Sequence, residues 1–248
     1  MKYVIILLFA FLLVSCADNS GDLTADEIVD KAIENAGGDR YNNAEIDFVF
    51  RKRKYRSKRE GGKFQLERIM TDSTGNEIRD ILDNEGLERY VNDSAIQLPD
   101  SLKTPIGNSV NSVHYFVHLP FGLNAPAANK KLVGKDSIGE REYYEVKVTF
   151  SQNGGGTDHE DEYLYWIDTQ TFKVDYLAYN FETNDGGIRF RKAYNPRIIK
   201  GIRFVDYQNY KYEDLSTPLS ELDSLFEARE LELLSVIETE DVEVTLGS

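Results

Sequence analysis

The chain has little of several things that proteins use for covalent chemistry. Only one cysteine occurs in 248 residues, which excludes an intrachain disulfide and a redox-active thiol pair. The sequence also lacks the Gly-x-Ser-x-Gly turn of serine hydrolases, a Walker phosphate loop and the glycine-rich dinucleotide motif. We therefore predict a protein that is not an enzyme, with no catalytic residues and no cofactor.

Positive charge is scarce relative to negative charge. The chain has 29 lysines and arginines against 43 aspartates and glutamates, which gives a formal net charge of −14. Such a surface repels phosphate backbones, so we predict no nucleic-acid partner. Long hydrophobic runs are also few. The run Tyr3–Val14 is almost wholly apolar, but it is shorter than the ~20 residues that a membrane-spanning helix needs.

The apolar run Tyr3–Val14 follows a single positive charge, as in a secretory signal peptide. It ends at Leu13-Val14-Ser15-Cys16, which resembles the lipobox of bacterial lipoproteins. The resemblance implies that residues 1–15 are removed and that Cys16 carries acyl chains such as palmitate. Ala17, where aspartate would signal inner-membrane retention in that class, implies lipid anchoring in the outer membrane, on its periplasmic or surface side. An ordinary signal peptide with a chance cysteine is the alternative.

The rest of the chain is predicted to form one domain behind a short linker. Residues 16–23 are a polar tether, and residues 24–248 are the domain. A capping-box sequence, Thr24 to Glu27, precedes apolar residues at helical spacing. Gly37-Gly38 supplies a stop, because glycine adopts the left-handed conformation at a helix end. The sequence thus predicts a helix between Thr24 and Gly37.

From Glu45 onward the apolar period changes from 3.6 to 2 residues, and turn signals follow at close intervals. This pattern predicts an antiparallel meander. An apolar insert interrupts it, with one or two helical turns at Val110–Val117, and a second helix follows Pro218. Strands are expected at residues 45–50, 51–59, 64–70, 77–83, 87–91, 95–98, 131–135, 143–151, 162–168, 172–181, 187–194, 202–212, 233–238 and 242–246.

Several stretches resemble an uncharacterised family of Gram-negative outer-membrane lipoproteins. They are Leu119–Leu123 (LPFGL), Tyr143–Phe150 (YYEVKVTF), Leu164–Asp168 (LYWID), Arg191–Pro196 (RKAYNP) and Gly201–Tyr207 (GIRFVDY). The resemblance implies a fold like that of the lipoprotein-localisation proteins LolA and LolB. The expected fold class is α+β, with a large curved antiparallel sheet, or half-barrel, of about ten or more strands and helices on its concave side. The family supplies no activity to carry over.

A curved sheet covered by helices makes a concave pocket, which is the usual form of a ligand site. Residues 162–168 are apolar on both faces, as in a strand that is covered on both sides or lines a cavity. Packing in a filled core is the alternative for each apolar side chain there. We predict a ligand site formed by Phe48, Phe50, Phe116, Phe121, Leu123, Tyr163, Tyr165 and Trp166.

Seven of the nine residues from Arg51 to Arg59 are basic, a local reversal of sign in an acidic chain. On a strand these side chains point to both faces, so some face the concave side. We predict that Arg51, Arg53 and Arg56 bind the anionic head group of a ligand. The alternative is an edge strand that charge protects from aggregation.

The three histidines are the remaining candidates for chemistry. His114 and His118 share one face of a helix, as zinc ligands do, but buried histidines with hydrogen-bond partners are commoner in such apolar stretches. Asp158 and residues 160–162 surround His159. That cluster suits Ca²⁺ or paired catalytic carboxylates, whereas a solvated hairpin tip is the simpler interpretation. We predict no bound metal.

These observations favour a membrane-anchored, non-enzymatic lipoprotein that binds an apolar or amphipathic ligand, such as a lipid or a lipidated molecule, in the concave pocket. Its predicted partners are the membrane, through the lipid on Cys16, and that ligand; the oligomeric state stays open. A structural or interaction protein of the cell envelope with a filled core is the second hypothesis. A hydrolase or metal-binding protein that uses the acidic cluster around His159 is the third.

Overall fold

The computed structural model describes residues 23–151, 161–181 and 186–247. Cys16 and the expected signal peptide lie outside these residues, as do Asp158, His159 and Glu160. Within the described ranges, no helix is both long enough and apolar enough to cross a membrane.

The first of two antiparallel sheets gathers the strands from the first half of the chain and the last strand. Its order is β14-β1-β2-β3-β4-β5-β6. The register is regular between β2 and β5, where tight turns join consecutive strands. The strands are β1 Ala44–Phe50, β2 Arg53–Glu60, β3 Lys63–Thr71, β4 Glu77–Asp83, β5 Gly86–Val91, β6 Ser94–Ile96 and β14 Glu240–Leu246.

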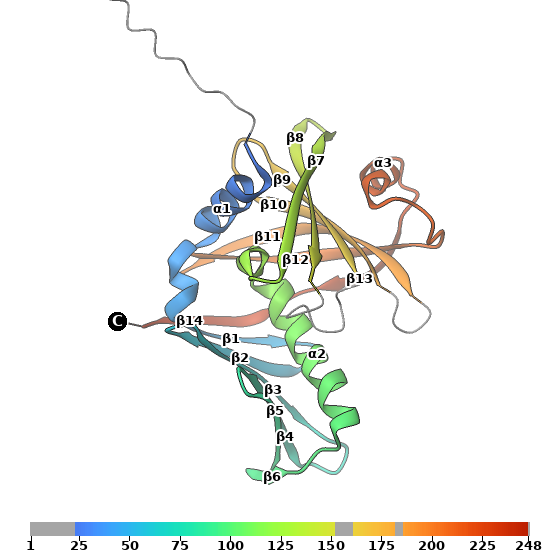
Figure 1. Cartoon of the computed structure of the whole chain (residues 1–248). Coiled ribbons are helices and arrows are strands. Elements are labelled where there is room, and N and C mark those ends of the chain that lie inside the picture. The colour runs from blue at the N-terminus through green and yellow to red at the C-terminus, as the bar shows by residue number, and fades with distance from the viewer. Residues whose placement is uncertain (1–22, 152–160, 182–185, 248) are drawn as a thin grey trace, which may run out of the picture.

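The second sheet is a meander in the order β13-β12-β11-β10-β9-β8-β7. Its strands are β7 Ala128–Ile138, β8 Arg141–Phe150, β9 Glu162–Asp168, β10 Val174–Phe181, β11 Gly187–Ile199, β12 Ile202–Tyr212 and β13 Glu232–Ile237. After β13 the chain crosses to the first sheet, where β14 pairs with β1. Figure 1 shows the two curved sheets one above the other. The predicted α+β class is confirmed, with the strands divided between two sheets.

The first helix, α1 (Ala25–Ala36), forms as the sequence predicts. The Thr24 hydroxyl accepts a hydrogen bond from the Glu27 amide, and the Glu27 carboxylate accepts one from the Thr24 amide. Gly37 ends the helix with a φ of 143°, which other residues rarely adopt. A short 3-10 helix, η1 (Gly38–Asn43), then leads into β1.

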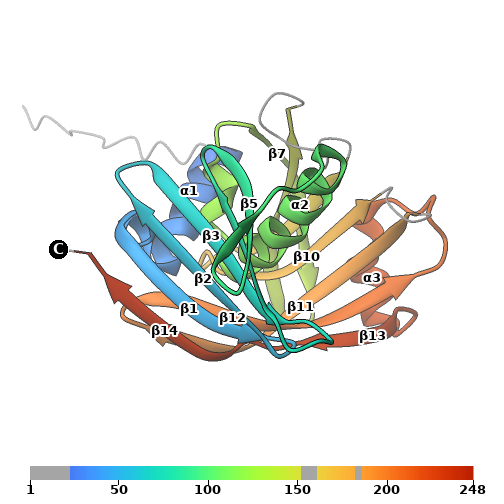
Figure 2. The ribbon, with the colours of Figure 1, turned by 90° about the horizontal axis from the view of Figure 1, so that it is seen from below.

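The helix α2 (Asp100–Val117) is much longer than the one or two turns predicted at Val110–Val117. Pro105 and Gly107 resemble helix breakers in the sequence, but both lie inside this helix. Pro105 is close to the N-terminus, so it removes only an early backbone hydrogen bond. Gly107 faces Leu82 of β4, and a Cβ there would be 3.6 Å from that side chain. Figure 2 shows α2 against the first sheet.

The C-terminal end of β11 also differs from the prediction. The sequence predicts a turn at Asn195-Pro196, yet the strand continues to Ile199. The pairing with β12 shifts between Tyr194 and Arg197. A bulge accommodates the proline, because the residues inside it need not donate to the neighbouring strand.

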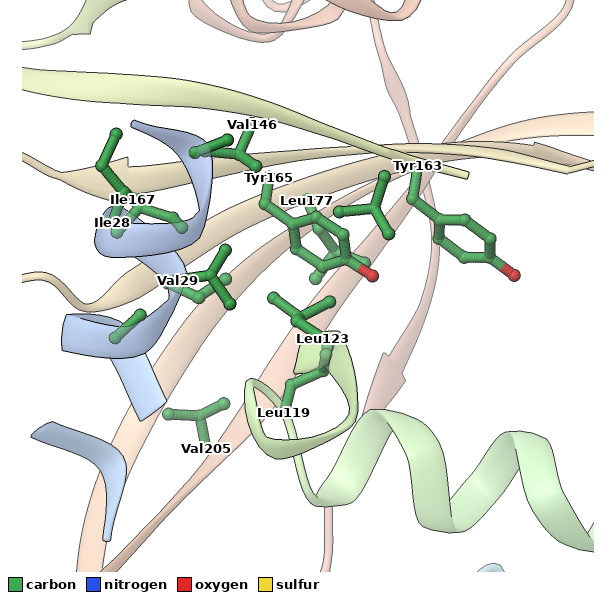
Figure 3. Packing of buried hydrophobic residues seen from close by; sticks show 14 of the residues in the cluster. Ile28, Val29, Leu119, Leu123, Val146, Tyr163, Tyr165, Ile167, Leu177 and Val205 are labelled. Atoms are coloured by element: carbon green, nitrogen blue, oxygen red, sulfur yellow. The ribbon is translucent and has the colours of Figure 1, made fainter. Parts of the chain in front are cut away.

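The second sheet is covered on both faces, as the apolar pattern of β9 predicts. Tyr165 and Ile167 face α1 and the 3-10 helix η2 (Phe121–Asn124), where Leu119 and Leu123 fill the space between them (Figure 3). Leu164 and Trp166 face the other way. They pack with Leu222 at the 3-10 helix η4 (Leu219–Glu221) and the helix α3 (Leu222–Glu227). Thus α1 and α2 lie on one side, as predicted, and α3 on the opposite side.

Candidate functional site: a cavity between the two sheets

A cavity of about 900 Å³ lies between the two sheets. The helices α1 and α2 and the 3-10 helix η2 form part of its wall. The strands β2 and β3 contribute from the first sheet, and β8 and β9 contribute from the second. The cavity opens to solvent beside three exposed carboxylates of α1 and η1, which are Asp30, Glu34 and Asp39.

The deeper wall of the cavity is mainly apolar. Phe121 is stacked on Tyr41, with the ring centroids 4.8 Å apart. Phe116 lies beneath the guanidinium of Arg191, 3.8 Å from its central carbon. Phe116, Phe121 and Tyr163, which the sequence predicts as ligand contacts, all line the cavity. Apolar lining residues not singled out from the sequence are Ile33, Phe64, Leu66, Tyr115 and Phe150.

The other predicted ligand contacts do not line this cavity. Phe48 is buried on β1 and stacks on Tyr55, with a centroid distance of 5.2 Å. Phe50 is partly buried at the end of the same strand, beneath the guanidinium of Arg51. Leu123 is wholly buried between α1 and the second sheet. These three side chains hold elements together.

Tyr165 and Trp166 are also wholly buried. The Tyr165 hydroxyl is 2.6 Å from the Tyr115 hydroxyl of α2, and this hydrogen bond joins the helix to the second sheet. Trp166 points to the opposite face, where its indole N–H donates to Asp223 at 3.2 Å. Neighbouring residues on a strand alternate between faces, so these two cannot line the same pocket.

The basic run contributes a different arginine from the three predicted. Arg51 lies in the turn before β2, with a φ of 49°, and Arg53 is exposed at the start of the strand. Arg56 points away from the cavity and pairs with Asp47 at 2.8 Å and with Glu45. Arg59, three residues later, lines the cavity.

The sequence pattern of β2 could have predicted that Arg59 points inward. Tyr55, Ser57 and Arg59 share one face of β2, and Tyr55 and Ser57 are buried. The apolar Tyr55 inside an otherwise charged run is the signal that marks this inward face. The alternation therefore places Arg53 and Arg59 on the inward face, and of these two Arg59 lines the cavity.

The Arg59 guanidinium is placed among aromatic rings. Its central carbon is 5.0 Å from the Phe121 ring centroid and 5.9 Å from that of Phe64. Its Nε atom is buried and has no hydrogen-bond partner in the described part of the chain. Burial lowers the pKa of Arg59, but a guanidinium remains charged at neutral pH. The lining of the cavity thus includes a cationic side chain.

His114 and His118 line the same end of the cavity as Arg59. The spacing predicts that they share a helix face, and their ring centroids are 5.6 Å apart. His114 Nε2 is 3.0 Å from the backbone oxygen of Glu67, and His118 Nε2 is 3.3 Å from the Ser57 hydroxyl. The described residues bring no third His, Cys, Asp or Glu close enough to complete a metal site with these rings.

Both histidines are held in the neutral form. Burial, followed by weaker effects that include the charge of Arg59, lowers the pKa of His114 to about 4 and that of His118 well below its usual value. A backbone oxygen can only accept, so His114 must carry its proton on Nε2. Its Nδ1 atom is then an acceptor, and it is buried without a partner in the described structure.

The acidic cluster that was a candidate for Ca²⁺ or hydrolysis is only partly described. His159 lies outside the described residues, and so do Asp158 and Glu160. Glu162 begins β9, where it pairs with Lys147 of β8 at 2.5 Å. The ion pair gives Glu162 a structural partner in the sheet.

A model of one protein family matches residues 2–239. The chain belongs to the family of unknown function DUF6503. This membership confirms the expectation of an uncharacterised family. None of the curated proteins matches the sequence of this DUF6503 member.

Solved structures resemble this DUF6503 chain over most of its length. A LolA superfamily protein from Nitrosomonas europaea is 15% identical, with a TM-score of 0.47, and the match covers 91% of this chain and 94% of that one. A DUF1329 family protein from Desulfovibrio piger is 11% identical, with a TM-score of 0.44 and coverages of 90% and 94%. The lipoprotein LppX of Mycobacterium tuberculosis is 6% identical, with a TM-score of 0.27 and coverages of 64% and 87%.

Because its histidines are buried in the neutral form, we expect the protein to lose stability in mild acid. The unfolded chain binds a proton at His114 below about pH 6.5, whereas the folded chain does so only near pH 4. Protons therefore favour the unfolded state between these values, and the contribution of His114 to the free energy of unfolding falls as the pH falls. From pH 6.5 to pH 5 we expect a loss of about 1–2 kcal/mol from this residue.

The measurement is urea unfolding of the parent and of His114→Gln at pH 6.5 and pH 5. Glutamine keeps a donor for the Glu67 oxygen but does not titrate, and the other titrating groups are common to both proteins. The parent should lose more stability than the variant over this interval. Equal losses would show that His114 is not held neutral by burial.

Proposed function

We propose that this DUF6503 protein is a non-enzymatic binding protein for an amphipathic ligand, whose apolar chain occupies the cavity and whose anionic group meets Arg59. The observation that carries the proposal is the cavity itself, about 900 Å³ of space with aromatic walls and one partly buried arginine, Arg59. Small-molecule sites in proteins are typically concave, mostly apolar and roughly 300–1,000 Å³ in volume, with a few polar groups that fix orientation.

The charge of the cavity favours an anionic group over a neutral one. Arg59 is a cationic residue in the cavity lining, and partial burial makes a hydrogen bond from a guanidinium to a charged acceptor stronger than it would be in water. The three carboxylates of the cavity mouth, Asp30, Glu34 and Asp39, are exposed, so solvent screens them. The deeper cation therefore dominates the interaction with the ligand.

The cavity also supports a binding function over the second hypothesis, a structural or interaction protein with a filled core. In a filled core the side chains leave few voids larger than a water molecule. Here Phe116, Phe121 and Tyr163 border open space. An apolar ligand that covers these rings is the occupant that their chemistry fits.

Replacing Arg59 should weaken the binding of anionic ligands selectively. A hydrogen bond to a charged group contributes about 1.5–3 kcal/mol, which is about a tenfold or larger change in Kd. We expect Arg59→Gln to raise the Kd of a pyrene-labelled fatty acid about tenfold or more, and to change the Kd of its methyl ester by less than about threefold. Fluorescence titration of both probes measures this difference.

Arg56→Gln is the matched control, because Arg56 points to the opposite face of β2. It should bind the acid and the ester as the parent does. An equal effect of Arg59→Gln on acid and ester would contradict the role of the charge. A parent protein that binds neither probe would contradict the proposed function as a whole.

We further propose that the protein is lipid-anchored to the outer membrane through Cys16. The lipobox-like sequence and the signal-type apolar run support this anchor. Two or three acyl chains hold a protein durably, whereas one holds it only marginally. Anchoring would keep the cavity close to a source of amphipathic ligands.

Cys16→Ala should abolish acylation. Labelled palmitate should enter the parent but not the variant, and the variant should leave the membrane fraction or remain unprocessed. Density fractionation should place the parent with outer-membrane markers. Label in the variant, or a parent that stays with inner-membrane markers, would refute the acylation or the sorting respectively.

A further inference from the structure

Three carboxylates from separate elements meet on the face of the second sheet that α3 covers. They are Asp136 on β7, Glu145 on β8 and Asp223 on α3. One oxygen of each lies within 4.8 Å of the others. Two oxygens that bind the same Ca²⁺ ion, each at about 2.3–2.6 Å, can be about 5 Å apart. A single ion can therefore contact all three side chains.

A bulge in β7 brings Asp136 to this face. Leu132 pairs with Val146, but after the bulge Gly134 pairs with Glu145 and Asp136 pairs with Tyr143. Directly paired residues project to the same side of a sheet. Without the extra residue, Asp136 would be on the other face, because a shift of one residue exchanges the faces of a strand.

Glu145 is the member of this cluster that has a buried oxygen without a hydrogen-bond partner among the described residues. The residue is 8% exposed, and its Oε1 atom is buried without a hydrogen bond in the described structure. Among the described residues, no lysine or arginine forms an ion pair with any of the three carboxylates. A buried carboxylate without a partner is costly unless it takes up a proton or a cation joins it.

Gly134 leaves space for the Glu145 carboxylate, and the cluster is open to solvent on one side. Gly134 lies opposite Glu145, and a Cβ there would be 3.3 Å from Glu145 Oε2. Asp136 is exposed, so the cluster is accessible from solvent. Asp223 is 1% exposed and is held by the indole N–H of Trp166, which fixes one ligand in place.

We propose that Asp136, Glu145 and Asp223 bind a Ca²⁺ ion, which fastens α3 to β7 and β8 at the edge of the second sheet. Carboxylate oxygens are ligands for hard cations, and Ca²⁺ tolerates an irregular shell that water completes. Mg²⁺ should bind more weakly, because it demands near-octahedral geometry. The site is separate from the cavity and does not depend on the function proposed for it. This proposal differs from our sequence-based prediction of no bound metal.

The test is calorimetric titration of the full chain with Ca²⁺ after treatment with a chelator, together with thermal melts. The parent should bind one Ca²⁺ per chain and melt at a higher temperature when loaded. Glu145→Gln keeps the shape of the side chain but removes its charge, and should weaken Ca²⁺ binding at least tenfold. Asp136→Asn should do the same. It lies on the surface, so it tests the site even if the buried substitution prevents folding.

Glu243→Gln, on the exposed side of β14, is the control for the loss of one charge. It should bind Ca²⁺ as the parent does. A parent that takes up no Ca²⁺ and melts identically with and without it would overturn the proposal. Ca²⁺ binding that both site variants retain would overturn it as well, because the ion would then bind elsewhere.

Discussion

The structure depends on one segment, residues 100–124, which packs against both sheets at once. Val113 and Val117 of α2 contact the cluster on the first sheet, while Leu119 and Leu123 fill the space between α1 and the second sheet. The hydrogen bond between Tyr115 and Tyr165 joins the same segment to β9. Because this segment bridges the sheets, they stay separated on one side of it, and that separation is the cavity.

Charged groups inside the protein differ in how fully their polar atoms are satisfied. Asp80 is wholly buried, but it binds Arg68 at 2.7 Å and Arg89 at 2.6 Å. Such a network is structural, and removal of one partner would leave an uncompensated charge. Arg59 and Glu145 each have a buried polar atom without a partner in the described residues. Arg79 and Arg203 also have an Nε atom without a partner in the described structure, but Arg59 lines the cavity and Glu145 belongs to the carboxylate cluster. We therefore propose an external ligand only at Arg59 and Glu145.

Local sequence patterns predicted most of the helices and strands, because these elements depend on interactions between residues close together in the chain. The capping box of α1 and the apolar run of β9 need only a few neighbouring residues. The length of α2 was missed because Pro105 and Gly107 disfavour a helix locally, and contacts with β4 compensate for them. The division into two sheets was missed because hydrogen-bond partners far apart in the chain decide it.

The candidate site was predicted only in part for the same reason. Phe116, Phe121 and Tyr163 line the cavity, whereas Phe48 and Trp166 are just as aromatic but pack in other clusters. Composition cannot distinguish a ring beside a void from a ring in a filled core. The three carboxylates of the proposed Ca²⁺ site come together only through a bulge in β7 and the return of α3, neither of which has a sequence signature.

The central claim is that the cavity accepts an apolar chain, and calorimetric titration with palmitate tests it most directly. Ser112 of α2 lines the cavity, so Ser112→Trp should fill it, whereas Thr104→Trp adds the same bulk at an exposed position of that helix. The parent and Thr104→Trp should show one saturable site, with the negative heat-capacity change of apolar burial when titrated at two temperatures. Ser112→Trp should show none. A parent without saturable binding, or a Ser112→Trp variant that binds as well as the parent, would contradict the account.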